Sequence, residues 1–113
     1  MPARLKVLTP DQLAAAQAGS DTRALVKHYL AVLEVRAPGR SVEVRVPPYA
    51  AVQVVPGVRH TRGTPPAVVE TDAETWLALA EGRTTWAAAL DSGSVVASGE
   101  RTDLSPYLPL GSG

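Results

Sequence analysis

The residues best suited to chemistry lie together in one polar segment, Arg59-His60-Thr61-Arg62-Gly63-Thr64. Two guanidinium groups and two hydroxyls so close together can hold a phosphate or another anionic head group. A histidine titrates near neutral pH, so His60 can serve as an acid or a base. Arg59, His60 and Arg62 are therefore candidate residues for binding an anionic head group. A solvated polar turn between two strands explains the same composition, and no glycine-rich phosphate fingerprint accompanies it.

The rest of the chain offers little for catalysis or metal binding. The sequence has no cysteine, which excludes disulfides, thiolate catalysis and zinc–thiolate sites. The two histidines are too few for a metal cluster without carboxylate help, and His28 fits an ordinary position on a helix. Ser92-Gly93-Ser94 does not form a nucleophile elbow, since the required first glycine is missing. We therefore expect no catalytic residue, no metal site, no cofactor and no enzymatic activity.

Size and charge narrow the class of protein. At 113 residues the chain has the size of one domain, which we place at residues 1–110, with a frayed tail at 111–113. Eleven basic and eleven acidic residues give zero net charge, so no electrostatic footprint for nucleic acid is present. The N-terminal residues lack the apolar core of a signal peptide, and no apolar run reaches membrane-spanning length. These features favour a cytoplasmic location.

The first third of the sequence predicts two helices. Thr9 can cap a helix that begins with Pro10, and Gln12 completes a capping box. This helix runs through alanine-rich sequence to Gly19. A second, longer helix is expected from Thr22 to Arg36, because its apolar residues recur at helical spacing.

From Ser41 the apolar period changes from 3.6 to 2, which indicates strands. Val42, Val44 and Val46 share one face of the first strand. Further strands are expected at 49–55, 67–71 and 94–98, while residues 58–64 either pair again or form a loop. Segregated helices and hairpin-connected strands favour an α+β fold with a mostly antiparallel sheet, covered by helices on one face.

Two short helices separate the last two strands. Thr71 to Glu74 has the form of a capping box, with Thr71 as the cap, and Gly82 suits the end of this helix. Thr84 or Thr85 can cap the next helix, and Gly93 can end it. The chain then closes with an apolar segment, Leu104 to Leu110, in which two prolines exclude a regular helix.

The ordered set of features from Ser41 to Leu110 resembles the bacterial stand-alone branch of the sterol carrier protein 2 family. The resemblance rests on an acidic helix start, an aromatic–leucine pair, a Gly-Arg turn and two glycines around the last strand: Asp72, Trp76-Leu77, Gly82-Arg83, Gly93 and Gly99. The segments Val42 to Pro48 and His60 to Pro66 also fit. The resemblance implies a five-stranded sheet with helices over one face and an apolar cavity between sheet and helices.

The residues that we expect to line such a cavity are apolar residues of the two short helices, the last strand and the tail: Trp76, Leu79, Trp86, Leu90, Val96, Leu104 and Leu108. Alanine-rich helices leave room for a ligand. The alternative is an ordinary filled core, because periodicity cannot reveal an empty volume.

Three functions remain open. The first is a non-enzymatic carrier of an apolar or amphiphilic ligand: a fatty acid, acyl-CoA, phospholipid or sterol-like lipid. The second is an accessory domain that assists a partner enzyme through His60 and Arg62. The third is a structural or dimerisation module. The expected partners are a lipid or another apolar small molecule, with transient contact to a membrane or an enzyme, and the chain is expected to be a monomer or weak dimer.

Overall fold

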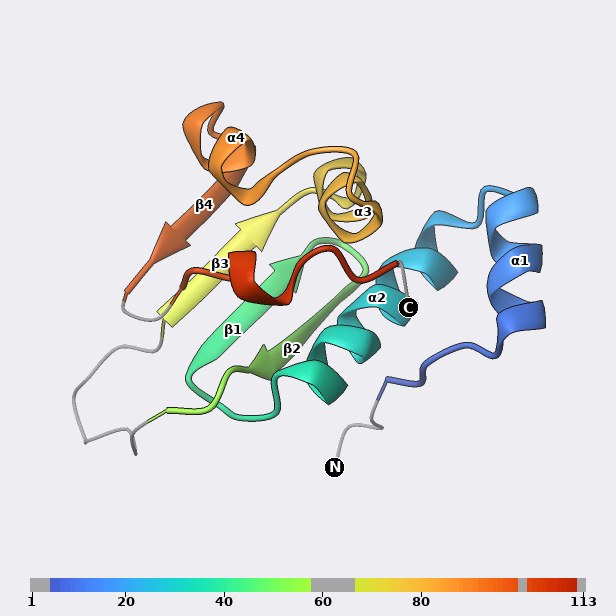
Figure 1. The fold of residues 1–113 in the computed structure, drawn as a ribbon, viewed down its shortest axis with the longest axis horizontal. Helices are drawn as coiled ribbons and strands as arrows, with labels where there is room; N and C mark the ends of the chain where they lie inside the picture. The colour runs from blue at the N-terminus through green and yellow to red at the C-terminus, as the bar shows by residue number, and fades with distance from the viewer. Residues whose placement is uncertain (1–4, 58–66, 100–101, 112–113) are drawn as a thin grey trace.

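The structure, a computed structural model, describes residues 5–57, 67–99 and 102–111. Its helices and strands follow the order α1 (Pro10–Ala18), α2 (Thr22–Arg36), β1 (Val42–Val46), β2 (Ala50–Val54), β3 (Ala67–Thr71), α3 (Ala73–Glu81), α4 (Trp86–Asp91), β4 (Val95–Ser98) and a 3₁₀ turn, η1 (Ser105–Tyr107). Figure 1 shows this arrangement. The α+β class predicted from the sequence is confirmed.

The strands form one sheet in the order β2-β1-β3-β4. The pairs β1–β2 and β3–β4 are antiparallel, and the central pair β1–β3 is parallel. The parallel pair aligns Val44 with Val69, and β1 pairs with β2 through Val44 and Val52. The sheet is therefore mostly antiparallel, as expected.

The expectation of five strands is wrong for the described residues, which form four. The tail from 102 to 111 is extended in part, but its backbone bonds go to a helix rather than to a strand. The amides of Leu110 and Gly111 both donate to the carbonyl of Ala80, at 2.7 and 2.8 Å. The prolines at 106 and 109 lack the amide hydrogens that a strand in this tail would need. Residues 58–64, for which the sequence leaves a strand or a loop open, lie outside the described residues.

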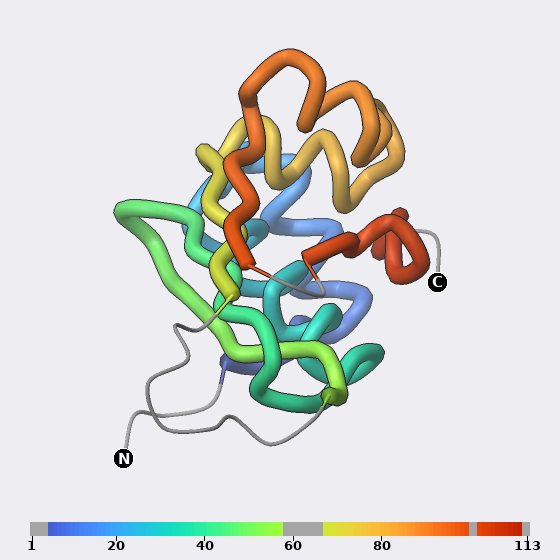
Figure 2. Tube along the Cα trace, turned by 90° about the vertical axis from the view of Figure 1, so that its left-hand side faces the viewer, coloured from blue at the N-terminus to red at the C-terminus, as the bar shows by residue number. Residues whose placement is uncertain are grey.

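One face of the sheet carries the core. Val42, Val44 and Val46 are fully buried, whereas Arg45 between them is exposed. The alternation follows from the two-residue period of a strand. Figure 2 shows α2, α3 and the C-terminal tail on the same side of the sheet. Helices over a single face of the sheet are the arrangement that the sequence predicts.

The space between the sheet and the helices is occupied by large side chains. Tyr29, Leu30, Leu33, Trp76 and Leu104 are each no more than 1% exposed. The indole Nε1 of Trp76 donates to the carbonyl of Val26 at 3.3 Å, which satisfies the one polar atom of that side chain. These residues form the interior on which the α3–α4 hairpin and the tail rest.

Candidate functional site

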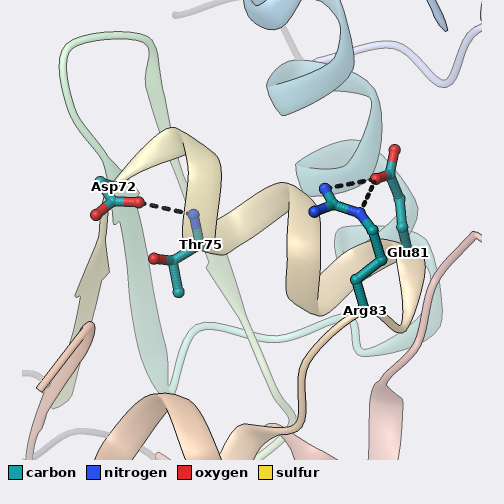
Figure 3. Close-up of polar contacts among 4 residues, drawn as sticks. All are labelled: Asp72, Thr75, Glu81 and Arg83. Carbon is teal, nitrogen blue, oxygen red and sulfur yellow. Dashed lines mark hydrogen bonds and ion pairs between the residues drawn. The ribbon is translucent and has the colours of Figure 1, made fainter. Parts of the chain in front are cut away.

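The α3–α4 hairpin begins with a cap at Asp72. Its carboxylate accepts a hydrogen bond from the amide of Thr75 at 2.7 Å (Figure 3). The capping role predicted for Thr71 is wrong, because Thr71 is the last residue of β3. Its buried hydroxyl instead donates to the carbonyl of Ser94 at 2.9 Å and joins β3 to the start of β4. The cap therefore falls one residue later, at the first exposed position after the strand.

A tight turn then reverses the chain. Gly82 ends α3 with a φ of 80°, a left-handed conformation that glycine adopts without steric cost. Thr85 begins α4, and its hydroxyl accepts from the amide of Ala88 at 3.1 Å. The sequence predicts Gly82 as the end of α3 and leaves Thr84 and Thr85 open as the cap of α4, which the structure places at Thr85. Between the end of α3 and the cap of α4 lie Arg83, which lines one of two clefts, and Thr84, which lines both.

The first cleft, here called the apolar groove, lies between the hairpin and the C-terminal tail. Its volume is about 290 Å³, and it opens to solvent. Leu79, Trp86, Leu108 and Pro109 supply its apolar surface, and the other lining residues are Gly82, Thr84, Thr85 and Ser105. The lining of the groove is thus mainly apolar, and three of its residues bear hydroxyl groups: Thr84, Thr85 and Ser105.

Long-range hydrogen bonds hold the tail in place as the outer wall of this groove. Arg36, at the end of α2, donates through Nη1 to the carbonyl of Pro109 at 2.9 Å, across 73 residues of sequence. The amides of Leu110 and Gly111 donate to the carbonyl of Ala80. Leu110 is 3% exposed. The wall is therefore fastened to α2 and to the end of α3.

The second cleft, here called the polar cleft, lies between the facing sides of α3 and α4. Its volume is about 210 Å³. Most of its lining side chains bear hydroxyl or charged groups, and the full lining is Glu74, Thr75, Ala78, Arg83, Thr84, Ala89, Ser92 and Ser94. Thr84 lines both clefts, so the polar cleft and the apolar groove meet at this residue.

The structure brings together three of the seven residues expected to contact an apolar ligand. Leu79, Trp86 and Leu108 line the apolar groove. Trp76 and Leu104 are buried in the core, at 1% and 0% exposed.

The remaining two, Leu90 and Val96, are 41% and 65% exposed and lie away from the groove. The candidate residues for an anionic head group, Arg59, His60 and Arg62, lie outside the described residues. The same holds for the accessory role assigned to His60 and Arg62.

Sequence reasoning did not identify the hydroxyl-bearing residues of either cleft. The sequence indicates Thr84 only as a possible helix cap, and it indicates no role for Thr75. Their spacing of nine residues matches no motif, because two helices separated by a turn bring them to one cleft. In the sequence, Ser92 and Ser94 fail to form a nucleophile elbow, and Ser94 begins the last expected strand. Their hydroxyl oxygens lie 2.9 Å apart. Two threonines and two serines around one alanine-rich hairpin were the available signal.

The titratable groups with shifted pKa values are not among the lining residues of either cleft. Burial lowers the pKa of His28, whose Nδ1 accepts from the amide of Leu8 at 3.0 Å. Burial raises the pKa of Tyr29, and the carboxylate of Glu81 adds to this effect. Hydrogen bonds from Ser105 lower the pKa of Asp103. None of these three shifts therefore marks an acid or a base in the lining of a cleft.

Two further properties bear on the kinds of site that the fold contains. Within residues 5–57, 67–99 and 102–111, no group of three or more histidine or acidic side chains is placed to hold a metal ion. Among the helices that the structure describes, none has the length and apolar character needed to cross a membrane.

One protein family matches most of the chain, including the α3–α4 hairpin and nearly all of the tail. The family model described as "Bacterial SCP ortholog" matches residues 18–110. The chain belongs to this bacterial SCP family. The match covers α2, the sheet, both clefts and the tail, and it confirms the resemblance recognised in the sequence. No curated protein matches the sequence of this bacterial SCP domain.

Proposed function

We propose that this domain binds and carries an apolar or amphiphilic small molecule, without catalysing a reaction, and that the apolar groove is its binding site. The observation that carries the proposal is the groove itself: Leu79, Trp86 and Leu108 border a volume of about 290 Å³ that remains open to solvent. Membership of the bacterial SCP family supports a carrier role.

The apolar groove does not lie where the family resemblance implies a cavity, which is between the sheet and the helices. Buried side chains such as Trp76 and Leu33 occupy the region between sheet and helices. The proposed ligand therefore lies on the outer side of the hairpin, against the tail. Burial of a methylene group stabilises a complex by about 0.8 kcal/mol, so a short alkyl chain can bind here without a charged anchor.

The test uses Leu108, which lines the groove and is only partly buried. Leu108→Ala removes apolar wall from the site while keeping most of the core intact. Leu13→Ala is the matched control, because Leu13 is also partly buried and lies on α1, which does not border the groove. Binding is followed with cis-parinaric acid, a fluorescent fatty acid, through energy transfer from the tryptophans.

We expect Leu108→Ala to weaken binding of the probe about fivefold, the equivalent of roughly 1 kcal/mol of lost apolar contact. Leu13→Ala should bind like the unaltered protein. Equal affinities for all three proteins would place the probe elsewhere on the surface. No saturable binding by the unaltered protein would contradict the proposed function.

A further inference from the structure

The apolar groove and the polar cleft meet at Thr84, and the inference drawn from this junction rests on the proposed function. We propose that the two clefts form one site for a single-chain amphiphile with an uncharged, hydroxyl-bearing head group. The chain lies in the apolar groove, the head group lies in the polar cleft, and the molecule bends past Thr84.

Size supports the joining of the two clefts. Sites for small molecules in proteins usually have volumes of roughly 300–1,000 Å³. The polar cleft alone, at about 210 Å³, falls short of this range, and the apolar groove, at about 290 Å³, lies at its lower limit. Joined through Thr84 they fall within it. A molecule that fills both must be apolar at one end and polar at the other.

Two hydroxyl groups of the polar cleft, those of Thr75 and Thr84, are available to a ligand. Within the part of the chain that the structure describes, the side-chain hydroxyls of Thr75 and Thr84 make no hydrogen bond. Both side chains are partly buried. A hydroxyl donates one hydrogen bond and accepts others, so each threonine can act as donor or acceptor toward an alcohol group of the ligand. A head group with several hydroxyls can therefore bond to both threonines at once.

Charge in the polar cleft disfavours an anionic head group. The guanidinium of Arg83 is already paired with the carboxylate of Glu81, at 3.0 Å from Nε and 2.8 Å from Nη2 (Figure 3). Glu74 supplies the carboxylate in the lining of the cleft, and Glu81 is not part of that lining. Arg83, its partner Glu81 and Glu74 together carry one net negative charge. A fatty-acid carboxylate or the phosphates of acyl-CoA would meet like charge, which lowers affinity.

The test compares decanoyl ligands that share a chain and differ in the head group. Binding of monodecanoylglycerol, decanoic acid and decanoyl-CoA is measured by calorimetry with the full chain. Decyl glucoside is included, because a sugar presents the same uncharged hydroxyl chemistry as glycerol. We expect monodecanoylglycerol, decyl glucoside or both to bind at least tenfold more tightly than decanoic acid, and decanoyl-CoA to bind most weakly.

Two variants locate the head group. Thr75→Val keeps the shape of the side chain and removes the hydroxyl, so affinity for the preferred neutral ligand should fall about fivefold, while affinity for decanoic acid should not change. Glu74→Gln should raise affinity for decanoic acid and leave the neutral ligands unaffected. Leu108→Ala should weaken all the ligands that bind.

The outcomes separate this inference from the proposed function. If every decanoyl ligand binds with similar affinity and Thr75→Val changes none, the groove binds chains and the head-group assignment is overturned. A preference for decanoic acid or decanoyl-CoA also overturns it. If no ligand binds to the unaltered protein, the proposed function itself fails.

Discussion

The C-terminal tail forms the outer wall of the proposed site, and its attachment to α2 can be weakened by one substitution. Arg36→Met removes the donors that bond to the carbonyl of Pro109, at 2.9 Å, and to that of Leu110, at 3.5 Å. Methionine retains the length and the helix propensity of the side chain. The substitution therefore acts on the tail rather than on the helix.

The expected magnitude follows from these two contacts. The longer bond lies at the limit of hydrogen-bond geometry and contributes little. The shorter bond involves a charged donor, but Arg36 is exposed, so we assign it about 1 kcal/mol, below the usual range for charged groups. A loss of about 1 kcal/mol raises the population of the detached tail about fivefold.

Hydrogen exchange reports this population directly. The amides of Leu110 and Gly111 donate to Ala80, so they exchange only when the tail detaches. In Arg36→Met both should exchange about fivefold faster, while the amides of β1 keep their rates. Arg23→Met, an exposed arginine near the other end of α2, is the control. Unchanged exchange at Leu110 and Gly111 would refute the assignment of Arg36 as the fastening residue.

Two further predictions concern the stability of the fold. His28 is buried and its pKa is lowered, so the unfolded chain binds more protons than the folded one just below the ordinary pKa of 6.5. Its contribution to the free energy of unfolding is complete above this value and is lost as the pH falls below it. Urea unfolding at pH 7.5 and 5.5 should show less pH dependence in His28→Gln than in the unaltered protein, and equal dependence would contradict this account. Gly39→Ala should lower the free energy of unfolding by more than about 2 kcal/mol, because the new Cβ would lie 2.1 Å from the carbonyl oxygen of Val55. Gly93→Ala, also at a positive φ but with open space around it, should cost only about 1 kcal/mol, and similar losses for both would contradict the steric argument.

Local patterns in the sequence predicted most of the fold. The capping box at Thr9 and Gln12 forms as predicted, and α2 spans the predicted residues. The alternation of Val42, Val44 and Val46 predicted the buried face of the first strand. These features depend on neighbours a few residues apart, so a single sequence contains the information that they need.

The candidate site depends on contacts that no local pattern shows. Trp76 and Trp86 have similar helical settings in the sequence, yet Trp76 fills the core and Trp86 also borders the groove. Trp86 borders the groove beside Pro109 of the tail, to which Arg36 bonds across 73 residues of sequence. The cap at the start of α3 was misplaced for a related reason. Thr71 bonds across the sheet to Ser94, and a local capping rule takes no account of that partner.

The central claim is that the apolar groove carries an amphiphilic ligand, and the contents of the purified protein test it most directly. The protein is purified from its own host without detergent, extracted with organic solvent, and analysed by mass spectrometry beside a denatured control. We predict one enriched single-chain amphiphile at a near-stoichiometric amount, and a marked loss of it in Leu108→Ala but not in Leu13→Ala. An empty extract, together with no change in tryptophan fluorescence on addition of decanoyl ligands, would contradict the claim.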